Sequence, residues 1–234
     1  MKEDTRWPGH IWTEKDVLQI LLWAAVLFGG FVLGTVLIYV LFPENVFALA
    51  FFLTTGGIVA LLAPVVYVLR RKGVTLQQFG VTDPGWKWLV LSLLVGVGVV
   101  ALGVFLSTLW AKGLGLGQSG GDAFTAETSE SVWLTILYAK IFTVLLVSVA
   151  EEVFFRGVIF RFLRQQEGFW IAAVLSALVF AALHLSFAAL PFLFLLGLAT
   201  AWVYERSGSL IAPIAVHVIV NNAAVNMYLF TLFS

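Results

Sequence analysis

The feature that most constrains this chain is a series of long apolar stretches with almost no charge. The first three, at residues 17–42, 46–69 and 89–110, contain no Asp, Glu, Lys or Arg. Each is long enough to cross a bilayer as a helix, which takes about 20 apolar residues. Strands of a membrane barrel would alternate polar and apolar residues over about 10 positions, and these stretches do not. The pattern therefore predicts membrane-spanning helices.

Further along the chain, apolar stretches with a few polar interruptions occupy residues 132–150, 168–185, 190–204 and 210–233. We therefore predict an all-α, polytopic transmembrane bundle of seven helices, or eight if a long segment breaks. The composition agrees, since 61% of the 234 residues are hydrophobic and only 11% are charged, against about 25% charged in a soluble domain. We expect residues 1–234 to form a single integral membrane domain.

Charge and cysteine content exclude several classes of function. The 13 Lys and Arg residues balance the 13 Asp and Glu residues, so the chain lacks the positive field that nucleic-acid binding requires. There is no cysteine, which excludes disulfides, thiolate nucleophiles and cysteine-based zinc sites.

The distribution of basic residues predicts the orientation in the membrane. Residues 1–16 form a polar N-terminal segment, and the apolar stretch after it is too long for a signal peptide. Cytoplasmic loops carry an excess of Lys and Arg. With a cytoplasmic N-terminus, Lys112 alone lies in an outer segment, and the inner segments contain Lys2, Arg6, Lys15, Arg70, Arg71, Lys72, Lys87, Arg161, Arg164 and Arg206. We therefore expect a protein of the cell membrane whose N-terminus lies in the cytoplasm. We also expect the Gly-rich outer loop, residues 112–131, to be a simple linker.

Ionisable side chains at membrane depth are costly, so each one is a candidate functional residue. They concentrate in the second half of the chain. Glu151 and Glu152 follow the stretch at 132–150, His184 ends the next one, and His217 lies in the last.

The spacing of these residues predicts which side chains share a helix face. Glu152 and Arg156 are four residues apart with the acidic residue first, which is the favourable order for a pair. His217 and Asn221 are also four residues apart and lie on one stripe.

Counting from the inner turns gives compatible depths for the three ionisable groups. Glu151 lies ~21 Å and His184 ~26 Å along their helices from the turn at residues 165–167. His217 lies ~14 Å from the turn at residues 206–208. These heights agree if the turn at residues 165–167 projects ~10 Å beyond the membrane at the end of a long helix.

Plainer interpretations exist for single residues. An intramembrane His or Asn usually makes an interhelical hydrogen bond, and paired acids with an Arg at a helix end are often an interfacial cluster. We expect Lys140 to snorkel or to be paired, and Phe180 to pack in the core. Gly96, Gly98 and Gly103 are expected to let helices approach closely. A site is favoured by the joint occurrence of a carboxylate, two imidazoles and a carboxamide at compatible depths.

Three motifs in the second half of the chain resemble those of the CPBP family (CAAX protease and bacteriocin-processing) of intramembrane endopeptidases, which is related to the Ras-converting CAAX proteases. They are Glu151-Glu152-x-x-x-Arg156, Phe180-x-x-x-His184 and His217-x-x-x-Asn221. The resemblance covers residues 131–226, the expected motif-bearing catalytic core. It implies an endopeptidase acting on a membrane-associated protein or peptide, lipidated in some cases, in CAAX-type or bacteriocin/pheromone-type processing.

The resemblance also implies roles for the motif residues. Glu151 matches the catalytic glutamate and His184 the histidine that acts with it. His217 and Asn221 match a pair assigned either to transition-state stabilisation or to metal ligation. The supporting pair is Glu152 with Arg156.

Two schemes fit these residues. In the metal-free scheme, which needs no cofactor, Glu151 is the general base, His184 holds the attacking water, and His217 with Asn221 donates to the oxyanion. In the metal scheme, Glu151, His184 and His217 bind Zn²⁺ or another divalent metal, with an open position for water, and Glu152 is a candidate base. The absence of a His-Glu-x-x-His motif slightly favours the metal-free scheme.

Two other classes of function fit an integral membrane chain. A transporter or channel also contains intramembrane Glu, His and Lys, although it would be expected to spread them through the bundle and to show internal repeats. A non-catalytic immunity or scaffold protein would keep the fold without needing every motif residue.

Overall fold

The computed structural model describes residues 10–115 and 136–233. In chain order its helices are α1 (Glu14–Leu41), α2 (Val46–Lys72), α3 (Leu76–Phe79), α4 (Trp86–Gly113), η2 (Ala139–Val147), α6 (Ser148–Phe154), η3 (Phe155–Phe160), α7 (Arg161–Gln166), α8 (Phe169–Leu183), α9 (Leu190–Ser207) and α10 (Ile211–Phe233). The described residues contain no strand, so the all-α prediction is confirmed. The start of the polar N-terminal segment and most of the outer loop expected at 112–131 lie outside the described residues.

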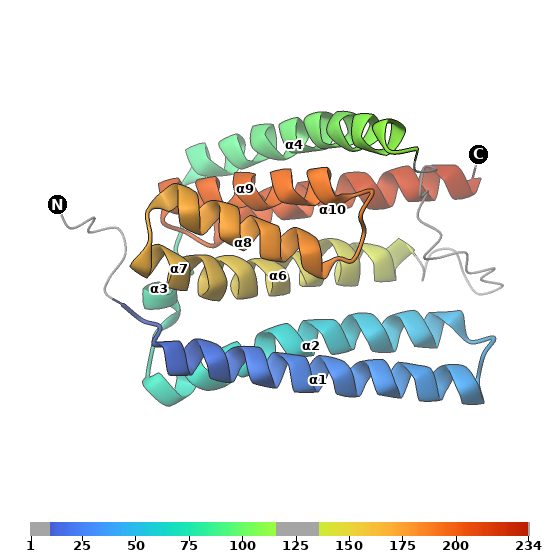
Figure 1. Ribbon diagram of the computed structural model, residues 1–234, viewed down its shortest axis with the longest axis horizontal. Helices are drawn as coiled ribbons and strands as arrows, with labels where there is room; N and C mark the ends of the chain where they lie inside the picture. Colours follow the sequence, from blue (N-terminus) through green and yellow to red (C-terminus); the bar gives the residue numbers. More distant parts are fainter. Residues whose placement is uncertain (1–9, 116–135, 234) are drawn as a thin grey trace.

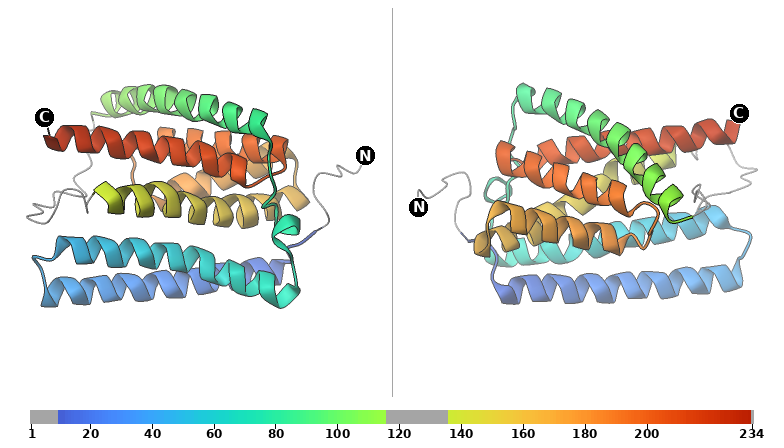
Figure 2. Two further views of the ribbon diagram at one scale, coloured as in Figure 1. Left: turned by 180° about the vertical axis from the view of Figure 1, so that it is seen from behind. Right: turned by 45° about the horizontal axis from the view of Figure 1, so that its top comes forward.

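The helices from η2 to α7 follow one another without a break and form a single long rod. This rod lies in the middle of the molecule, where it contacts α2, α8, α9 and α10. The α1–α2 hairpin packs on one side of it, and α4 lies on the opposite side against α9 and α10 (Figures 1 and 2). The central rod therefore lies between the α1–α2 hairpin and the layer of α4, α9 and α10.

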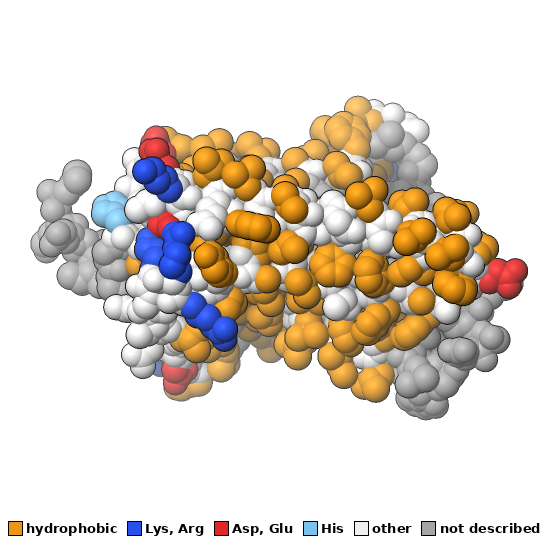
Figure 3. Space-filling view, turned by 90° about the horizontal axis from the view of Figure 1, so that it is seen from below, with side chains coloured by type: hydrophobic (Ala, Val, Ile, Leu, Met, Phe, Trp, Pro, Cys, Tyr) orange, Lys and Arg blue, Asp and Glu red, His pale blue; other side chains and the backbone are white. Residues whose placement is uncertain are grey.

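Four of the described helices are long and apolar enough to cross a membrane, judged by length and composition: α1, α2, α4 and α10. α8 is apolar but has only 15 residues. Seven or eight spans therefore stay a prediction. Over the α1–α2 side, apolar side chains cover most of the length and Lys and Arg gather at one end (Figure 3). That distribution fits a surface that faces lipid, with a polar end outside the apolar layer.

The described end of the polar N-terminal segment is fixed to the central rod. Thr13 caps α1 through a reciprocal pair of hydrogen bonds with Asp16. The indole Nε1–H of Trp12 donates to the carbonyl oxygen of Gly157 at 2.7 Å. Asp16 is paired with Arg71 and Lys72 at the end of α2. The hairpin and the rod are thus joined at the end where the basic residues gather.

Arg161 organises the same end of the molecule. The sequence places it among the basic residues of an inner segment, yet its side chain is only 4% exposed. Its guanidinium donates to the carbonyl oxygens of Gln78 and Phe79, both at 3.0 Å, which holds α3 against the rod. The carbonyl of Gly80 in turn accepts from the backbone N–H of Leu210 at 2.8 Å. Arg161 therefore serves packing between segments rather than contact with solvent.

Small residues allow close helix contacts at some of the expected positions. A Cβ on Gly96 would lie 2.9 Å from Ile219 of α10, and one on Gly103 would lie 2.4 Å from the ring of Phe192 of α9. A Cβ on Gly98 would have no heavy atom within 4 Å. The packing interpretation is therefore confirmed for Gly96 and Gly103 and wrong for Gly98.

Helices α8 and α9 also approach each other closely near the motif residues. A Cβ on Gly197 would lie 2.7 Å from the Cβ and 2.8 Å from the Cα of Ala177. Gly197→Ala must push the two helices apart, and we expect it to lower the free energy of unfolding by about 1–3 kcal/mol. Gly98→Ala is the matched control, since it adds the same methyl group inside a helix where space is open. Unfolding of both variants in one detergent checks this, and equal stability would contradict the packing described.

Candidate active site

The first motif begins on α6, which carries Glu151 and Glu152, and ends at Arg156 in η3; α6 lies between two segments of wider π-helical turn, η2 and η3. Such segments occur frequently at functional sites. Glu151 and Glu152 are consecutive, so their side chains leave α6 in directions about 100° apart. Glu151 lies at the edge of the bundle interior with 16% of its side chain exposed, whereas the side chain of Glu152 is fully buried.

The structure brings Glu151 together with both histidines of the second and third motifs. One carboxylate oxygen lies 3.4 Å from Nε2 of His217, and the other lies 3.9 Å from Nε2 of His184. His184 comes from the C-cap of α8, and His217 from α10. Three helices that are separate in sequence thus meet at one carboxylate.

The hydrogen bonds of the two histidines fix which ring nitrogen faces Glu151. His184 Nδ1 lies 2.8 Å from the carbonyl oxygen of Phe180, which only accepts, so this nitrogen is the donor. His217 Nδ1 lies 2.7 Å from Oε1 of Glu152 and donates to that carboxylate. In the neutral ring, each Nε2 then has a lone pair directed toward Glu151.

A fully buried ion pair supports His217. Arg156 donates to Oε1 of Glu152 at 3.0 Å and to the carbonyl oxygen of Gly197 at 3.1 Å, and its side chain is 1% exposed. The pairing expected from the four-residue spacing is therefore present. Glu151, Glu152 and Arg156 together have a formal charge of −1. One proton on an imidazole makes the cluster neutral, which suits an apolar surrounding.

Phe180 lies at the centre of this cluster. Its ring centroid is 4.6 Å from that of His184 and 5.8 Å from that of His217. The Arg156 guanidinium carbon lies 4.9 Å from the Phe180 ring centroid, within reach of a cation–π contact. The packing role expected for Phe180 is confirmed, and the residues packed against it are those of the motifs.

Asn221 lies one helical turn beyond His217 and has partners on the central rod. Its Nδ2 donates to Oγ of Ser148 at 3.0 Å and to the carbonyl oxygen of Thr143 at 3.3 Å. Sequence reasoning missed Ser148 and Thr143 as partners. A buried serine three residues before Glu151 was the available signal, but serine in a membrane helix commonly bonds its own backbone, as Ser148 also does with Val144.

The donor set of the candidate active site has the chemistry of a zinc site. Two Nε2 atoms and a carboxylate are the ligands of a His₂Glu centre, and the Nδ1 bonds resemble the outer partners that orient metal-bound histidines. Zinc needs its ligands about 2 Å away on converging lines. Within residues 10–115 and 136–233, no group of three His, Cys, Asp or Glu residues is arranged to hold a metal ion. The metal-free scheme and the metal scheme therefore both stay predictions.

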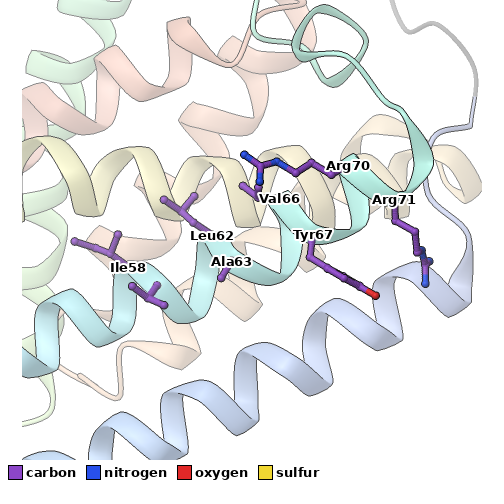
Figure 4. A pocket seen from close by; sticks show the side chains of 8 residues that line it. Ile58, Leu62, Ala63, Val66, Tyr67, Arg70 and Arg71 are labelled. Atoms are coloured by element: carbon purple, nitrogen blue, oxygen red, sulfur yellow. The ribbon is translucent and has the colours of Figure 1, made fainter.

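A hollow in the surface lies away from this cluster. It has a volume of about 670 Å³ and lies along α2, where apolar side chains such as Leu62 and Val66 line it and Arg70 and Arg71 stand at one end (Figure 4). None of its lining residues comes from α6, α8 or α10. We therefore treat it as separate from the candidate active site.

The fold and the site together define a helical membrane protein with a glutamate and two histidines gathered between its helices. Residues 131–223 match the sequence profile described as type II CAAX prenyl endopeptidase Rce1-like. The chain is also 32% identical over 174 residues to an uncharacterized 24.3 kDa protein of Escherichia coli, covering 71% of this chain and 75% of that protein. No solved structure matches. The chain belongs to the CPBP family of CAAX-type intramembrane proteases, and it is an integral membrane protein.

Proposed function

We propose that this protein is an intramembrane endopeptidase that hydrolyses a peptide bond in a membrane-associated protein or peptide. The observation that carries the proposal is the position of Glu151, whose two carboxylate oxygens face Nε2 of His184 and Nε2 of His217. CAAX-type processing and bacteriocin- or pheromone-type processing are both within this proposal. We further propose a multi-pass protein of the cell membrane with its N-terminus in the cytoplasm.

In the first step, Glu151 acts as general base. It takes a proton from a water molecule held between its carboxylate and Nε2 of His184, and the water oxygen bonds to the carbonyl carbon of the substrate. The separation of 3.9 Å between these two groups is too long for a direct hydrogen bond and suits a bridged one.

Attack by water gives a tetrahedral intermediate whose negative oxygen must be stabilised by hydrogen-bond donors. A protonated His217 supplies Nε2–H, and its charge is balanced by Glu152 on the other ring nitrogen. Asn221 is a second donor once it exchanges its longer bond, to the Thr143 carbonyl, for the substrate oxygen. Collapse of the intermediate breaks the carbon–nitrogen bond, and Glu151 returns its proton to the leaving amine. The products are a carboxylic acid and an amine, with one water consumed.

Exposure indicates where the substrate enters. The side chain of His184 is 31% exposed, whereas that of His217 is 2% exposed. The site is therefore open on the α8 side and closed toward α10. Beside His184, Leu183 and Leu185 are exposed apolar residues at the end of α8. An apolar or lipidated segment of a membrane-associated substrate fits this opening.

The test is incubation of purified protein, in liposomes, with a panel of membrane-associated and prenylated peptides, followed by mass spectrometry of the products. The proposal expects two product peptides whose masses add up to the mass of the substrate plus one water. A transporter would move solute across the liposome without cleaving the panel. A non-catalytic scaffold would neither cleave nor transport, and either result would overturn the proposal.

The metal-free scheme makes its own prediction. We expect treatment with a membrane-permeant chelator to change the cleavage rate by less than about twofold, because the proposed proton transfers use only side chains. Metal content of the purified protein, measured by mass spectrometry, is the companion readout. Loss of activity that added zinc restores would assign Glu151, His184 and His217 as ligands and retire the metal-free scheme.

A further inference from the structure

The hollow along α2 is lined by two parallel rows of side chains (Figure 4). Neighbours within a row are four residues apart, so both rows follow one face of the helix. One row contains Ile58, Leu62, Val66 and Arg70, and the other ends at Arg71. The volume of about 670 Å³ is within the range of ligand-binding pockets, ~300–1,000 Å³. This α2 hollow is therefore an elongated groove along a single helix.

The length and position of the α2 hollow match one leaflet of a bilayer. Ile58 and Arg70 are twelve residues apart in the chain, which is ~18 Å along a helix. The hydrocarbon layer of one leaflet is ~15 Å thick, half of the ~30 Å core. α2 is long and apolar enough to cross a membrane, and Arg70 lies in its last turn. The hollow therefore extends from the polar end of a candidate span toward its middle, as an acyl chain does.

Charged groups are confined to one end of the α2 hollow. From Ile58 to Val66 the lining side chains are apolar, and the two lining arginines come at the end of the helix. A long apolar groove that ends at a positive charge is complementary to an amphiphile with an apolar tail and an anionic head group.

The cations next to Arg70 already have an acidic partner. Arg71 and Lys72 both pair with Asp16, and Arg71 also donates to Oε1 of Gln19. Among the described residues, the guanidinium of Arg70 has no hydrogen-bond or ion-pair partner. Its charge is therefore available to an anion.

The side chain of Arg70 lies over the α2 hollow. In Figure 4 it extends back along the helix toward Val66, whereas Arg71 points toward α1. An arginine that only reaches for water would extend its head group toward the end of the helix. A guanidinium binds a phosphate through two parallel hydrogen bonds. Arg70 thus presents these donors where the head group of an amphiphile in the groove would lie.

We propose that the α2 hollow binds one anionic phospholipid, with an acyl chain along its apolar rows and the phosphate on the guanidinium of Arg70. The surroundings agree, since apolar side chains cover most of the α1–α2 side and Lys and Arg gather at one end (Figure 3). The inference concerns a lipid-binding site and is independent of the proposed endopeptidase function.

A lipidated substrate is another amphiphile that could occupy an apolar groove. The opening proposed for the substrate lies beside His184 at the end of α8, and no residue that lines the α2 hollow comes from α6, α8 or α10. A ligand in the hollow is therefore not presented to the proposed catalytic residues. This position favours a lipid of the bilayer.

The test is native mass spectrometry of the full chain, purified in detergent and mixed with equal amounts of dioleoyl phosphatidylglycerol and dioleoyl phosphatidylcholine. We expect the first bound lipid to be phosphatidylglycerol about fivefold or more often than phosphatidylcholine, and Arg70→Gln to lower this ratio to about one. The matched control is Arg206→Gln, which removes an exposed arginine from the last turn of α9, outside the hollow. The control should keep the ratio of the unmodified protein, although both variants lose one positive charge.

A second pair of variants tests the groove without changing the charge. Ala63 is exposed and lines the α2 hollow, so the ring of Ala63→Phe occupies the space proposed for the acyl chain. This variant should lose most of the bound phosphatidylglycerol. Ala101→Phe, which adds the same ring at an exposed alanine of α4, should retain it.

Equal binding of the two phospholipids by the unmodified protein would overturn the inference, since that comparison needs no variant to fold. An equal loss of preference in Arg70→Gln and Arg206→Gln would show a general attraction to positive charge and would also overturn it. If an S-farnesyl peptide at equal concentration displaced the bound phosphatidylglycerol, the hollow would belong to the substrate and the inference would be wrong.

Discussion

Replacing Glu151 by Gln is expected to abolish peptide hydrolysis, with a loss of at least about 10²–10⁴-fold in rate. The amide keeps the size of the side chain but cannot accept the proton of the attacking water. Among the described residues, the nearest charged partner of the Glu151 carboxylate is Nε2 of His217 at 3.4 Å, so the variant should retain the fold. Cleavage rate and thermal unfolding of the same preparation, in liposomes and in detergent, measure the two effects separately.

A matched control for this variant is Glu44→Gln, which makes the same change at an exposed carboxylate in the turn between α1 and α2. We expect the control to cleave at the rate of the unmodified protein. An active Glu151→Gln variant would remove Glu151 from the mechanism and leave Glu152 as the candidate base. Loss of activity together with loss of folding would instead assign Glu151 a structural role.

Replacing Arg156 by Met is expected to have the largest effect on stability, lowering the free energy of unfolding by about 3–5 kcal/mol. The variant leaves the carboxylate of Glu152 fully buried without its arginine partner. Combining Arg156→Met with Glu152→Gln removes the stranded charge, so the double variant should regain part of the lost stability. Unfolding in mixed micelles, analysed as a double-mutant cycle, measures the coupling.

The exposed pair of Arg71 with Asp16 provides the control. The Arg71 side chain is 47% exposed and Lys72 also neutralises Asp16, so Arg71→Met should change stability by no more than about 1 kcal/mol. If the Arg156→Met variant were as stable as the Arg71→Met variant, the result would contradict the buried ion pair. A double variant less stable than the single one would contradict the stranded-charge explanation.

Much of the helical architecture is predictable from apolar length alone. The stretches at 17–42, 46–69 and 89–110 correspond to α1, α2 and α4 within a few residues. The number of membrane spans is harder to predict from the sequence, because α8 and α9 are short or end in polar residues. Whether such helices cross the bilayer depends on their packing. The continuation of the central rod to Gln166 agrees with the long helix that the depth argument requires.

The site was predictable where regular helical spacing applies. Four-residue spacing indicates that Glu152 can reach Arg156, and their ion pair is present. Spacing does not indicate the two π-helical segments, since these depend on which backbone carbonyl each N–H finds in the packed rod. It also does not indicate that Phe180 lies between both histidines, or that Asn221 is bonded to Thr143 and Ser148. Those contacts depend on how α6, α8 and α10 lie relative to one another.

The partners of Lys140 could not be predicted from the sequence either, because they also depend on helix packing. From the sequence it resembles any lysine near a helix end, and snorkelling is the ordinary expectation. Only the packing of η2 on α10 brings Asn222 and Asn226 to its ammonium. A pair of asparagines four residues apart was the available signal, but their partner lies 82 and 86 residues away in the chain.

The claim that Glu151 activates water for direct attack is tested most directly by a single turnover in H₂¹⁸O. The measurement is mass spectrometry of the new C-terminal carboxylate and of the peptide that contains Glu151. Direct attack predicts one ¹⁸O in the first product molecule and none in Glu151. A first product that holds only ¹⁶O, with the label in the Glu151 carboxylate, would show a covalent intermediate on that residue and contradict the mechanism.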